Sequence, residues 1–391
     1  MKRIGAVALV RELMMDFAGL TGLTAGGTTP RRYLWTDAFA LCNYLELFRQ
    51  TQDETWRELA LRLVDEVHHV LGRQRGDDRR TGWISGLGEE EGERHPTAGG
   101  LRIGKPMNER NPGEPADERL EWDRDGQYYH YLTKWMHALN RASRVTGDPT
   151  YAGWAMELAQ TAHARFTYVP YMGGRKMMYW KMSIDLSRPI VPSMGQHDPL
   201  DGLITYSELQ ATATGDSGQS SRPGLSAEIA EMAAICRGRS WATADPLGIG
   251  GLLADAWRMA QLSVRGDFAS AELLDSVVNA ALEGVESFTE SNQLTLPAAY
   301  RLAFRELGLV IGLKGAGKLR EWLAANPDAF GRNSPLRQRL EELAEYLPLS
   351  ETIERFWLDG ANREAESWRE HREINMVMLA TSLAPEGFLA V

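Results

Sequence analysis

The sequence has little cysteine, no long apolar run and no excess of positive charge. Its two cysteines, Cys42 and Cys236, both fall in helical patterns, so we interpret them as buried apolar thiols. No run approaches the roughly 18 apolar residues that a membrane-spanning helix needs. Lysine and arginine number 43 against 53 aspartates and glutamates, a net charge of −10. That balance disfavours nucleic acid and anionic membranes as partners.

The first ten residues briefly resemble a signal peptide. Arg11, Glu12 and Asp16 end the apolar run, and no small-residue cleavage site follows. We therefore expect a cytoplasmic protein. Hydrophobic residues make up 43% of the chain and charged residues 25%, which is ordinary for a soluble globular protein. No change in composition marks a boundary, so we expect one domain over residues 1–391.

Apolar periodicity predicts about twelve helices in hairpins, after a first helix over 7–17. The expected helices cover 37–50, 56–70, 128–146, 151–166, a segment from 198 onward, 226–237, 249–262, 269–287, 298–313, 319–325, 336–346, 349–357 and 365–383. Turns within a pair are short, whereas connections between pairs are long. In one long connection apolar and polar residues alternate over 178–187, which predicts a strand with Lys181, Ser183 and Asp185 on one face.

The two helices of a pair differ in polarity. The first is apolar or small nearly all round, and the second is amphipathic, which fits an inner ring of helices inside an outer ring. The sequence therefore predicts an all-α protein, an (α/α)6 toroid of about six helical hairpins, with one small β-hairpin or strand in a long loop. The long connections would gather where the inner helices begin, and such loops commonly carry sites.

From about Trp35 to Leu383 this pattern resembles the six-hairpin glycosidase-like, or (α/α)6-barrel, superfamily. The motif-like echoes are Trp-Thr-Asp-Ala-Phe at 35–39 and Asp-Pro-Leu-Asp-Gly at 198–202, which both put acids at the start of an inner helix. The superfamily includes glycoside hydrolases, unsaturated glucuronyl hydrolases and N-acylglucosamine 2-epimerases. The resemblance implies a carbohydrate-active enzyme with a small saccharide as its ligand.

Acidic residues gather at the expected starts of inner helices. The segment 121–127 places three acids beside a tryptophan, and 193–201 is the densest polar run, with a histidine suited to proton transfer near neutral pH. The candidate catalytic residues are Asp37, Asp123, Asp125, His197, Asp198 and Asp201. We expect them at one end of the ring. Capping of helix ends is the alternative role for the acids.

Candidate ligand contacts come from the same connections and from the last helix. They are Trp35, Trp122, Gln127, Trp180, Lys181 and His371. Flat aromatic rings stack on sugar faces, although burial explains tryptophans equally well. Lys181 would favour an anionic or hydroxyl-rich ligand. We expect no metal and no cofactor.

Three functions stay open on the sequence alone. The first is hydrolysis of a glycosidic bond by an acid pair chosen from Asp37, Asp123, Asp125, Asp198 and Asp201, one protonated and one ionised. The second is a sugar epimerase or isomerase in which His197 and His371 exchange a proton. The third is a non-catalytic toroid that binds a saccharide or a protein.

Overall fold

The chain folds into two compact units, which are described separately. The computed structural model describes residues 3–24, 30–215, 224–266, 268, 270–331 and 334–391. Unit 1 comprises Met1–Phe17 and Gly238–Val391, and unit 2 comprises Ala18–Arg237. The single domain expected over 1–391 stays a prediction.

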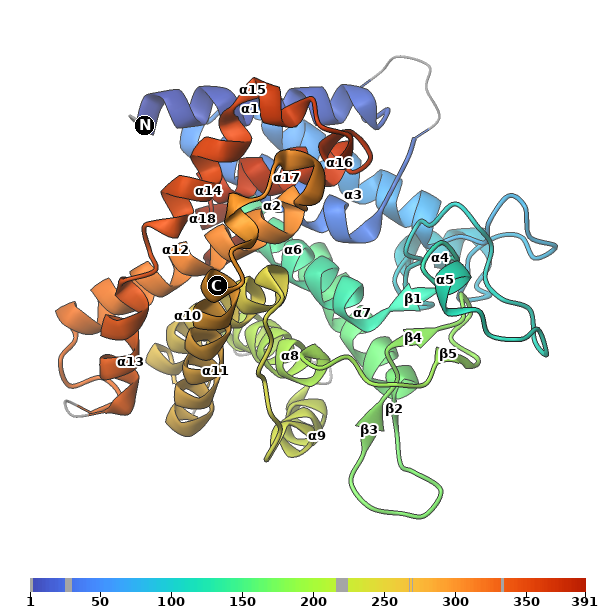
Figure 1. Ribbon diagram of the computed structural model, residues 1–391. Helices are drawn as coiled ribbons and strands as arrows, with labels where there is room; N and C mark the ends of the chain where they lie inside the picture. The colour runs from blue at the N-terminus through green and yellow to red at the C-terminus, as the bar shows by residue number, and fades with distance from the viewer. Residues whose placement is uncertain (1–2, 25–29, 216–223, 267, 269, 332–333) are drawn as a thin grey trace. The chain divides into compact units, whose positions relative to one another are not determined.

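Unit 2 is built from three helical hairpins (Figure 1). They are α2 (Leu34–Thr51) with α3 (Glu54–Leu71), α6 (Tyr129–Thr146) with α7 (Pro149–Phe166), and α8 (Asp198–Gly215) with α9 (Ser226–Cys236). Each pair is closed by a short turn except the last. Helix α6 packs against both α2 and α8, so the three first helices form the inner layer, as the apolar pattern predicts.

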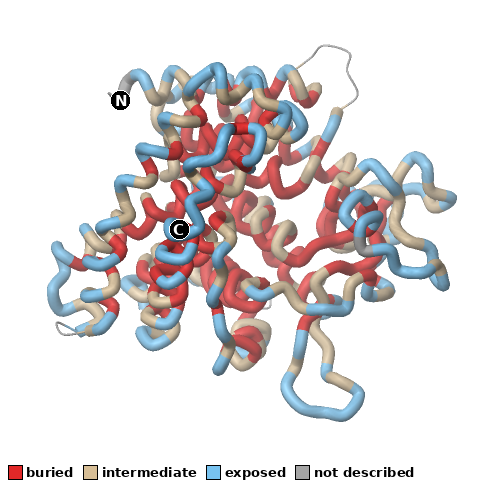
Figure 2. The backbone as a smooth tube through the Cα atoms, viewed as in Figure 1, coloured by how far each residue is buried: buried red, intermediate tan, exposed pale blue. Residues whose placement is uncertain are grey.

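The core of unit 2 lies along these inner helices (Figure 2). Polar side chains within it are paired: Tyr129 donates its hydroxyl to Tyr206 at 2.8 Å. Between α6 and α3, Trp135 Nε1 donates to His68 Nε2 at 3.2 Å, and both side chains are buried. Burial lowers the pKa of His68 to about 3, with a smaller contribution from His69, so this imidazole is neutral near pH 7.

The long connections of unit 2 contain short helices and strands that lie together (Figure 1). The helices are α4 (Glu89–Arg94) and α5 (Glu118–Glu121). Strands β1 (Gln127–Tyr128), β4 (Lys181–Met182) and β5 (Pro189–Val191) form an antiparallel sheet in the order β1-β4-β5, and β2 (Thr167–Tyr168) pairs with β3 (Met177–Met178). The described β-structure is therefore two small sheets rather than one hairpin.

The prediction of one strand over 178–187 is wrong: strand β3 ends at Met178, strand β4 covers only Lys181–Met182, and no strand follows up to 187. The chain turns there: Ser187 N donates to Asp185 Oδ1 at 3.1 Å, and Arg188 N donates to Ser183 Oγ at 3.1 Å. Leu186 has a positive φ of 55°. Short polar side chains can hydrogen-bond to backbone groups that would otherwise pair with a neighbouring strand. A polar turn can also have the same alternation of polar and apolar residues as a strand. Lys181 is buried whereas Asp185 is exposed, so they share no face.

Unit 1 is helical throughout its described part, with no strand there. Its longer elements are α1 (Arg3–Leu20, which extends into unit 2), α10 (Pro246–Val264), α11 (Ala271–Glu290), α12 (Ala303–Ala325), α13 (Pro335–Ala344), α14 (Leu349–Leu358) and α17 (Arg372–Leu383). Short helical turns are η1 (Gln293–Thr295), η2 (Ala298–Tyr300), α15 (Gly360–Arg363), α16 (Glu366–Arg369) and α18 (Glu386–Leu389). Helix α12 packs against α10, α13, α14 and α17.

In unit 1 one predicted break between helices is absent, and one predicted helix is interrupted. No turn forms between 313 and 319, because α12 continues through Gly315 and Gly317 to Ala325. The predicted helix over 365–383 is interrupted between Arg369 and Arg372, where His371 adopts a non-helical conformation. Glycine inside a helical pattern lowers helix propensity without forbidding the helix.

Glycines let the backbones of α10 and α12 touch. A Cβ added to Gly250 would lie 2.1 Å from the carbonyl oxygen of Gly308, and one added to Gly312 would lie 2.3 Å from that of Gly250. Contacts this short displace a backbone rather than a side chain. The crossing therefore requires glycine on both helices.

We expect Gly250→Ala to lower the free energy of unfolding by about 1–3 kcal/mol, because the added methyl overpacks this crossing. Gly251→Ala is the matched control: no atom lies within 4 Å of its added Cβ. It should be neutral or stabilising by up to about 1 kcal/mol, since alanine favours helix. Urea unfolding of the two variants measures both, and equal effects would contradict the close approach.

Candidate functional site

A cluster of ionisable side chains joins the start of α6 to the start of α8. His130 Nδ1 lies 3.5 Å from Asp198 Oδ1, and Lys134 Nζ donates to Asp201 Oδ1 at 2.7 Å. Thr133 Oγ1 also donates to the carboxylate of Asp201. His130, Lys134, Asp198 and Asp201 are called the His130 cluster below.

Helix geometry explains why these groups meet. His130 and Lys134 are four residues apart on α6, and Asp198 and Asp201 are three apart on α8, so each pair shares a helix face. Both carboxylates lie in the first turn of α8, where unpaired N–H groups favour negative charge. Both are buried. The cluster therefore holds both carboxylates in fixed positions.

His130 is the accessible proton acceptor of the cluster. Its side chain is 30% exposed, against 7% for Asp198. Burial lowers the pKa of His130 to about 4; Asp201 opposes this shift and Lys134 adds to it. The imidazole is therefore neutral near pH 7 and can take a proton, and Asp198 can stabilise the cation that results.

Aromatic rings surround His130. Its ring lies 6.3 Å from Trp180 and 5.4 Å from Tyr128, nearly parallel to both, and 4.9 Å edge-on from Tyr131. Tyr33, just before α2, shares a 2.6 Å hydrogen bond with the Tyr131 hydroxyl. Trp122 packs edge-on against Trp180 at 5.5 Å and is 56% exposed. We call Tyr33, Trp122, Tyr128, Tyr131 and Trp180 the aromatic wall.

Among the predicted acids, Asp125 is fully occupied by structural contacts. It is buried, and Oδ2 accepts from Arg102 Nη1 at 2.6 Å and from Arg75 Nη1 at 3.1 Å. Oδ1 accepts from the amides of Gly104 and Gly126, each at 3.0 Å. Asp125 thus ties the connection after α3 to the start of β1.

Asp37 has a similar capping role. It is buried in the first turn of α2, accepts from Tyr33 N at 2.9 Å and lies 3.4 Å from Arg32. Burial raises the pKa of Asp37 to about 6, against the charge of Arg32 and the Tyr33 hydrogen bond, and Glu66 raises it further.

The remaining predicted catalytic residues, Asp123 and His197, are more accessible. Asp123 is exposed on the connection that leads to β1. His197 is half-buried just before α8, and its carbonyl accepts from the amide of Asp201 at 3.0 Å. Of the six predicted positions, the structure places Asp198 and Asp201 in the His130 cluster, with His197 adjoining it in sequence.

The predicted ligand contacts separate into two kinds. Trp122 and Trp180 belong to the aromatic wall. Gln127 and Lys181 are buried and bonded to backbone: Gln127 Nε2 donates to Gly99 and Ile184, and Lys181 Nζ donates to Glu121 and Arg124. Trp35 is buried against Phe39. His371 belongs to unit 1, where its ring lies 5.5 Å from Phe304.

Our sequence reasoning missed His130, Lys134, Tyr33, Tyr128 and Tyr131 as site residues. The spacing could have indicated two of them, because His130 and Lys134 lie four residues apart, on one face at the beginning of an expected inner helix. The pattern of apolar and aromatic residues around 128–139 indicated burial on every side, which hid the polar face of this turn.

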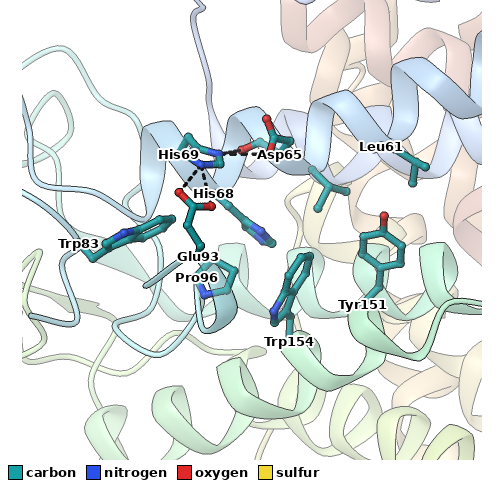
Figure 3. A pocket seen from close by; sticks show the side chains of 10 residues that line it. Leu61, Asp65, His68, His69, Trp83, Glu93, Pro96, Tyr151 and Trp154 are labelled. Carbon is teal, nitrogen blue, oxygen red and sulfur yellow. Dashed lines mark hydrogen bonds and ion pairs between the residues drawn. The ribbon is translucent and has the colours of Figure 1, made fainter. Parts of the chain in front are cut away.

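A separate cavity of about 120 Å³ lies on the outer helices of unit 2, and no predicted site residue lines it (Figure 3). Its lining comes from α3, α7 and the loop around α4: Leu61, Val64, Asp65, His68, His69, Trp83, Glu93, Pro96, Tyr151 and Trp154. His69 contacts Asp65 and Glu93 there, with Nε2 2.9 Å from Glu93. These pairings hold the α4 loop against α3.

Among the residues that the structure describes, no group of three or more histidine, cysteine, aspartate and glutamate side chains could hold a metal ion. No helix in that part of the chain has the length and apolar character needed to cross a membrane.

No protein-family model and no curated protein matches the chain. Solved structures do. The GH76A alpha-1,6-mannanase of Salegentibacter sp. HEL1_6 is 14% identical, with a TM-score of 0.52 over 97% of this chain and 99% of that one. An inactive double aspartate-to-asparagine variant of it, in complex with alpha-1,6-mannotriose, is 13% identical, with a TM-score of 0.52 over the same shares.

A third similar structure is the cellobiose 2-epimerase of Bacillus thermoamylovorans, 10% identical, with a TM-score of 0.47 over 87% of this chain and 86% of that one. The mannanase likeness shows the fold: the chain has an (α/α)6 architecture. The predicted fold class is confirmed.

Asp123 and Asp125 offer a matched test of which acids are structural. We expect Asp125→Asn to lower the free energy of unfolding by about 3–5 kcal/mol, because the buried Arg102 loses its counter-ion and Arg75 is left with Asp77 alone. Asp123→Asn should change it by no more than about 0.5 kcal/mol, as for other exposed positions. Chemical denaturation measures both, and a stable Asp125→Asn variant would contradict the structural role.

Proposed function

We propose that this protein is a carbohydrate-active enzyme whose active site is the His130 cluster with the aromatic wall. The observation that supports this most directly is the neutral, partly exposed imidazole of His130 among flat rings and beside Asp198. Aromatic faces bind the apolar faces of sugars, and a neutral imidazole can accept a proton from water or from carbon. The similarity in fold to a mannanase agrees with this proposal, but a fold alone does not determine the reaction.

Hydrolysis of a glycosidic bond is the reaction we propose first. Water would attack the anomeric carbon while a base takes its proton, and a carboxylic acid would protonate the leaving oxygen as the C–O bond breaks. Asp198 and Asp201 supply the acid pair in this scheme, and Lys134 stabilises the charged form of Asp201. His130 is placed to relay a proton through Asp198.

The mannanase variant described as inactive replaces two successive aspartates. The sequence here has one such pair, Asp77-Asp78. Arg75 Nε donates to Asp77 at 2.7 Å, and Arg80 Nη2 donates to Asp78 at 2.9 Å. The hydrogen bond from Arg80 holds the pKa of Asp78 well below its usual range. Acids held in this way are poor proton donors, so we assign the chemistry to α8 instead.

Epimerisation at the carbon next to a sugar carbonyl is the second candidate. The neutral state of His130 at pH 7 is compatible with it, because removal of a proton from carbon needs an unprotonated base; the lowered pKa makes this imidazole a weaker base than an ordinary histidine. In this scheme the imidazole takes the proton from one face of the sugar, and a second group returns one to the other face. The predicted pair of His197 and His371 is not required for this step.

The decisive assay screens neutral and acidic oligosaccharides for new reducing ends and for deuterium incorporation from D2O. New reducing ends indicate hydrolysis, and solvent deuterium on carbon indicates epimerisation. We expect His130→Asn and Asp198→Asn to lower kcat/KM by about 10²–10⁴-fold, the usual contribution of an acid–base group.

The control variant is His95→Asn. His95 lies directly after α4, and its side chain is paired with Glu157 of α7. This variant should keep full activity. Unchanged activity in both His130→Asn and Asp198→Asn, with melting temperatures near that of the wild type, would place the chemistry elsewhere.

The pH dependence gives an independent check. A group whose pKa is lowered to about 4 is unprotonated above that pH. If His130 acts as the base, kcat/KM should stay constant from neutral pH down to about pH 5 and then fall with an apparent pKa near 4. A fall centred near 6.5, the ordinary value for histidine, would show that a group other than His130 controls the rate.

A further inference from the structure

Lys105 is a partly buried cation beside the aromatic wall. It follows Ile103 and Gly104 in the connection after α3, and its Nζ lies 5.4 Å from the centroid of the Tyr33 ring. Among the residues that the structure describes, no carboxylate lies within ion-pair distance of this Nζ. Burial lowers the pKa of Lys105, although Asp123 and Asp125 act from farther away in the opposite direction.

Other cations in the same region are paired. Lys134 binds Asp201 at 2.7 Å, Lys181 lies 3.4 Å from Glu121, and Arg110 binds Glu121 at 2.7 Å. A charge removed from water without a counter-ion destabilises the fold unless something else compensates it. The ring of Tyr33 supplies part of that compensation by a cation–π contact, which is weaker than an ion pair.

The position of Lys105 links it to His130 through adjoining rings. Tyr33 packs edge-on against Tyr131 at 5.5 Å, and Tyr131 packs edge-on against His130 at 4.9 Å. Lys105 is thus two rings from the proposed proton acceptor. A sugar ring is similar in length to one of these steps, so we expect a saccharide of a few rings along the aromatic wall to extend from His130 toward Lys105.

Neighbouring segments hold Lys105 in place. Leu34 N donates to Ile103 O at 3.0 Å, and Ile103 N donates to Gly126 O at 2.9 Å. Arg75 Nη1 donates to the carbonyl of Lys105 itself at 2.7 Å. The backbone on which this ammonium group stands is therefore fixed to α2 and to the start of β1, which suits a ligand contact.

We propose that Lys105 binds an anionic substituent of the substrate, so that the protein acts on an acidic saccharide. This inference rests on the proposed function and adds the class of sugar. The shared chemistry is a carboxylate or a sulfate group within one or two sugar rings of the reacting carbon. The anion replaces the missing counter-ion of Lys105, while the sugar faces pack on the aromatic wall.

The test compares acidic oligosaccharides with neutral counterparts of the same backbone. The probes are galacturonate, glucuronate and mannuronate oligomers, the carboxyl-reduced form of each, and a sulfated galactan oligomer with its desulfated form. Calorimetry on the full chain gives the Kd of each. We expect at least one acidic probe to bind about tenfold or more tightly than its neutral counterpart; tenfold corresponds to about 1.4 kcal/mol.

Two substitutions assign that preference to Lys105. Lys105→Gln should reduce it to within about twofold and leave the Kd of the neutral probe unchanged, whereas Lys105→Arg should keep most of it because the charge remains. Lys176→Gln is the control: Lys176 lies between β2 and β3 and is paired with Glu231 of α9. This substitution should not change the preference for the acidic probe. A preference for a uronate oligomer would identify the anionic group as a carboxylate, and a preference for the sulfated oligomer would identify it as a sulfate.

Failure of this inference can be told apart from failure of the proposed function. If neutral saccharides bind and turn over with no preference for any acidic probe, the inference about Lys105 is wrong and the proposed function stands. A preference that persists in Lys105→Gln overturns it as well. If no saccharide of either kind binds, both proposals fail.

Discussion

One buried carboxylate, that of Asp125, fixes the long connection after α3 to the start of β1. Four donors converge on it, two from arginine side chains and two from backbone amides. The segment that it anchors pairs with Gly126 and with the first residue of α2. The places of Tyr33, Lys105 and the beginning of α6 therefore depend on one charge that water does not reach.

The acids near the helix starts divide by what they contact. Asp37 and Asp125 satisfy backbone amides and arginines and are inaccessible. Asp198 and Asp201 face α6, where His130 is partly open to solvent. The same residue type at the start of neighbouring helices thus stabilises loops in two places and belongs to the His130 cluster in a third.

The sequence could predict the helices with strong periodicity, and the structure has them with ends shifted by a few residues, as in α2, α6 and α7. The prediction was wrong at 183–187, where a polar turn has the same alternation of polar and apolar residues as a strand. It was also wrong in α12, where glycines inside the helix were interpreted as a turn. In the site, local spacing indicated the acids of α8. Arg102 lies 23 residues from Asp125, and Glu121 lies 60 residues from Lys181; a single sequence carries no signal for such pairings.

The hydrogen bond between Trp135 and His68 has a consequence for the tautomer of the histidine. An indole nitrogen can only donate, so His68 Nε2 must present its lone pair and the proton must reside on Nδ1. Protonation of Nε2 would point two N–H groups at each other across the α3–α6 contact. Acid therefore reverses this contact from attraction to repulsion, so the attachment of the outer helix α3 to α6 is coupled to proton uptake.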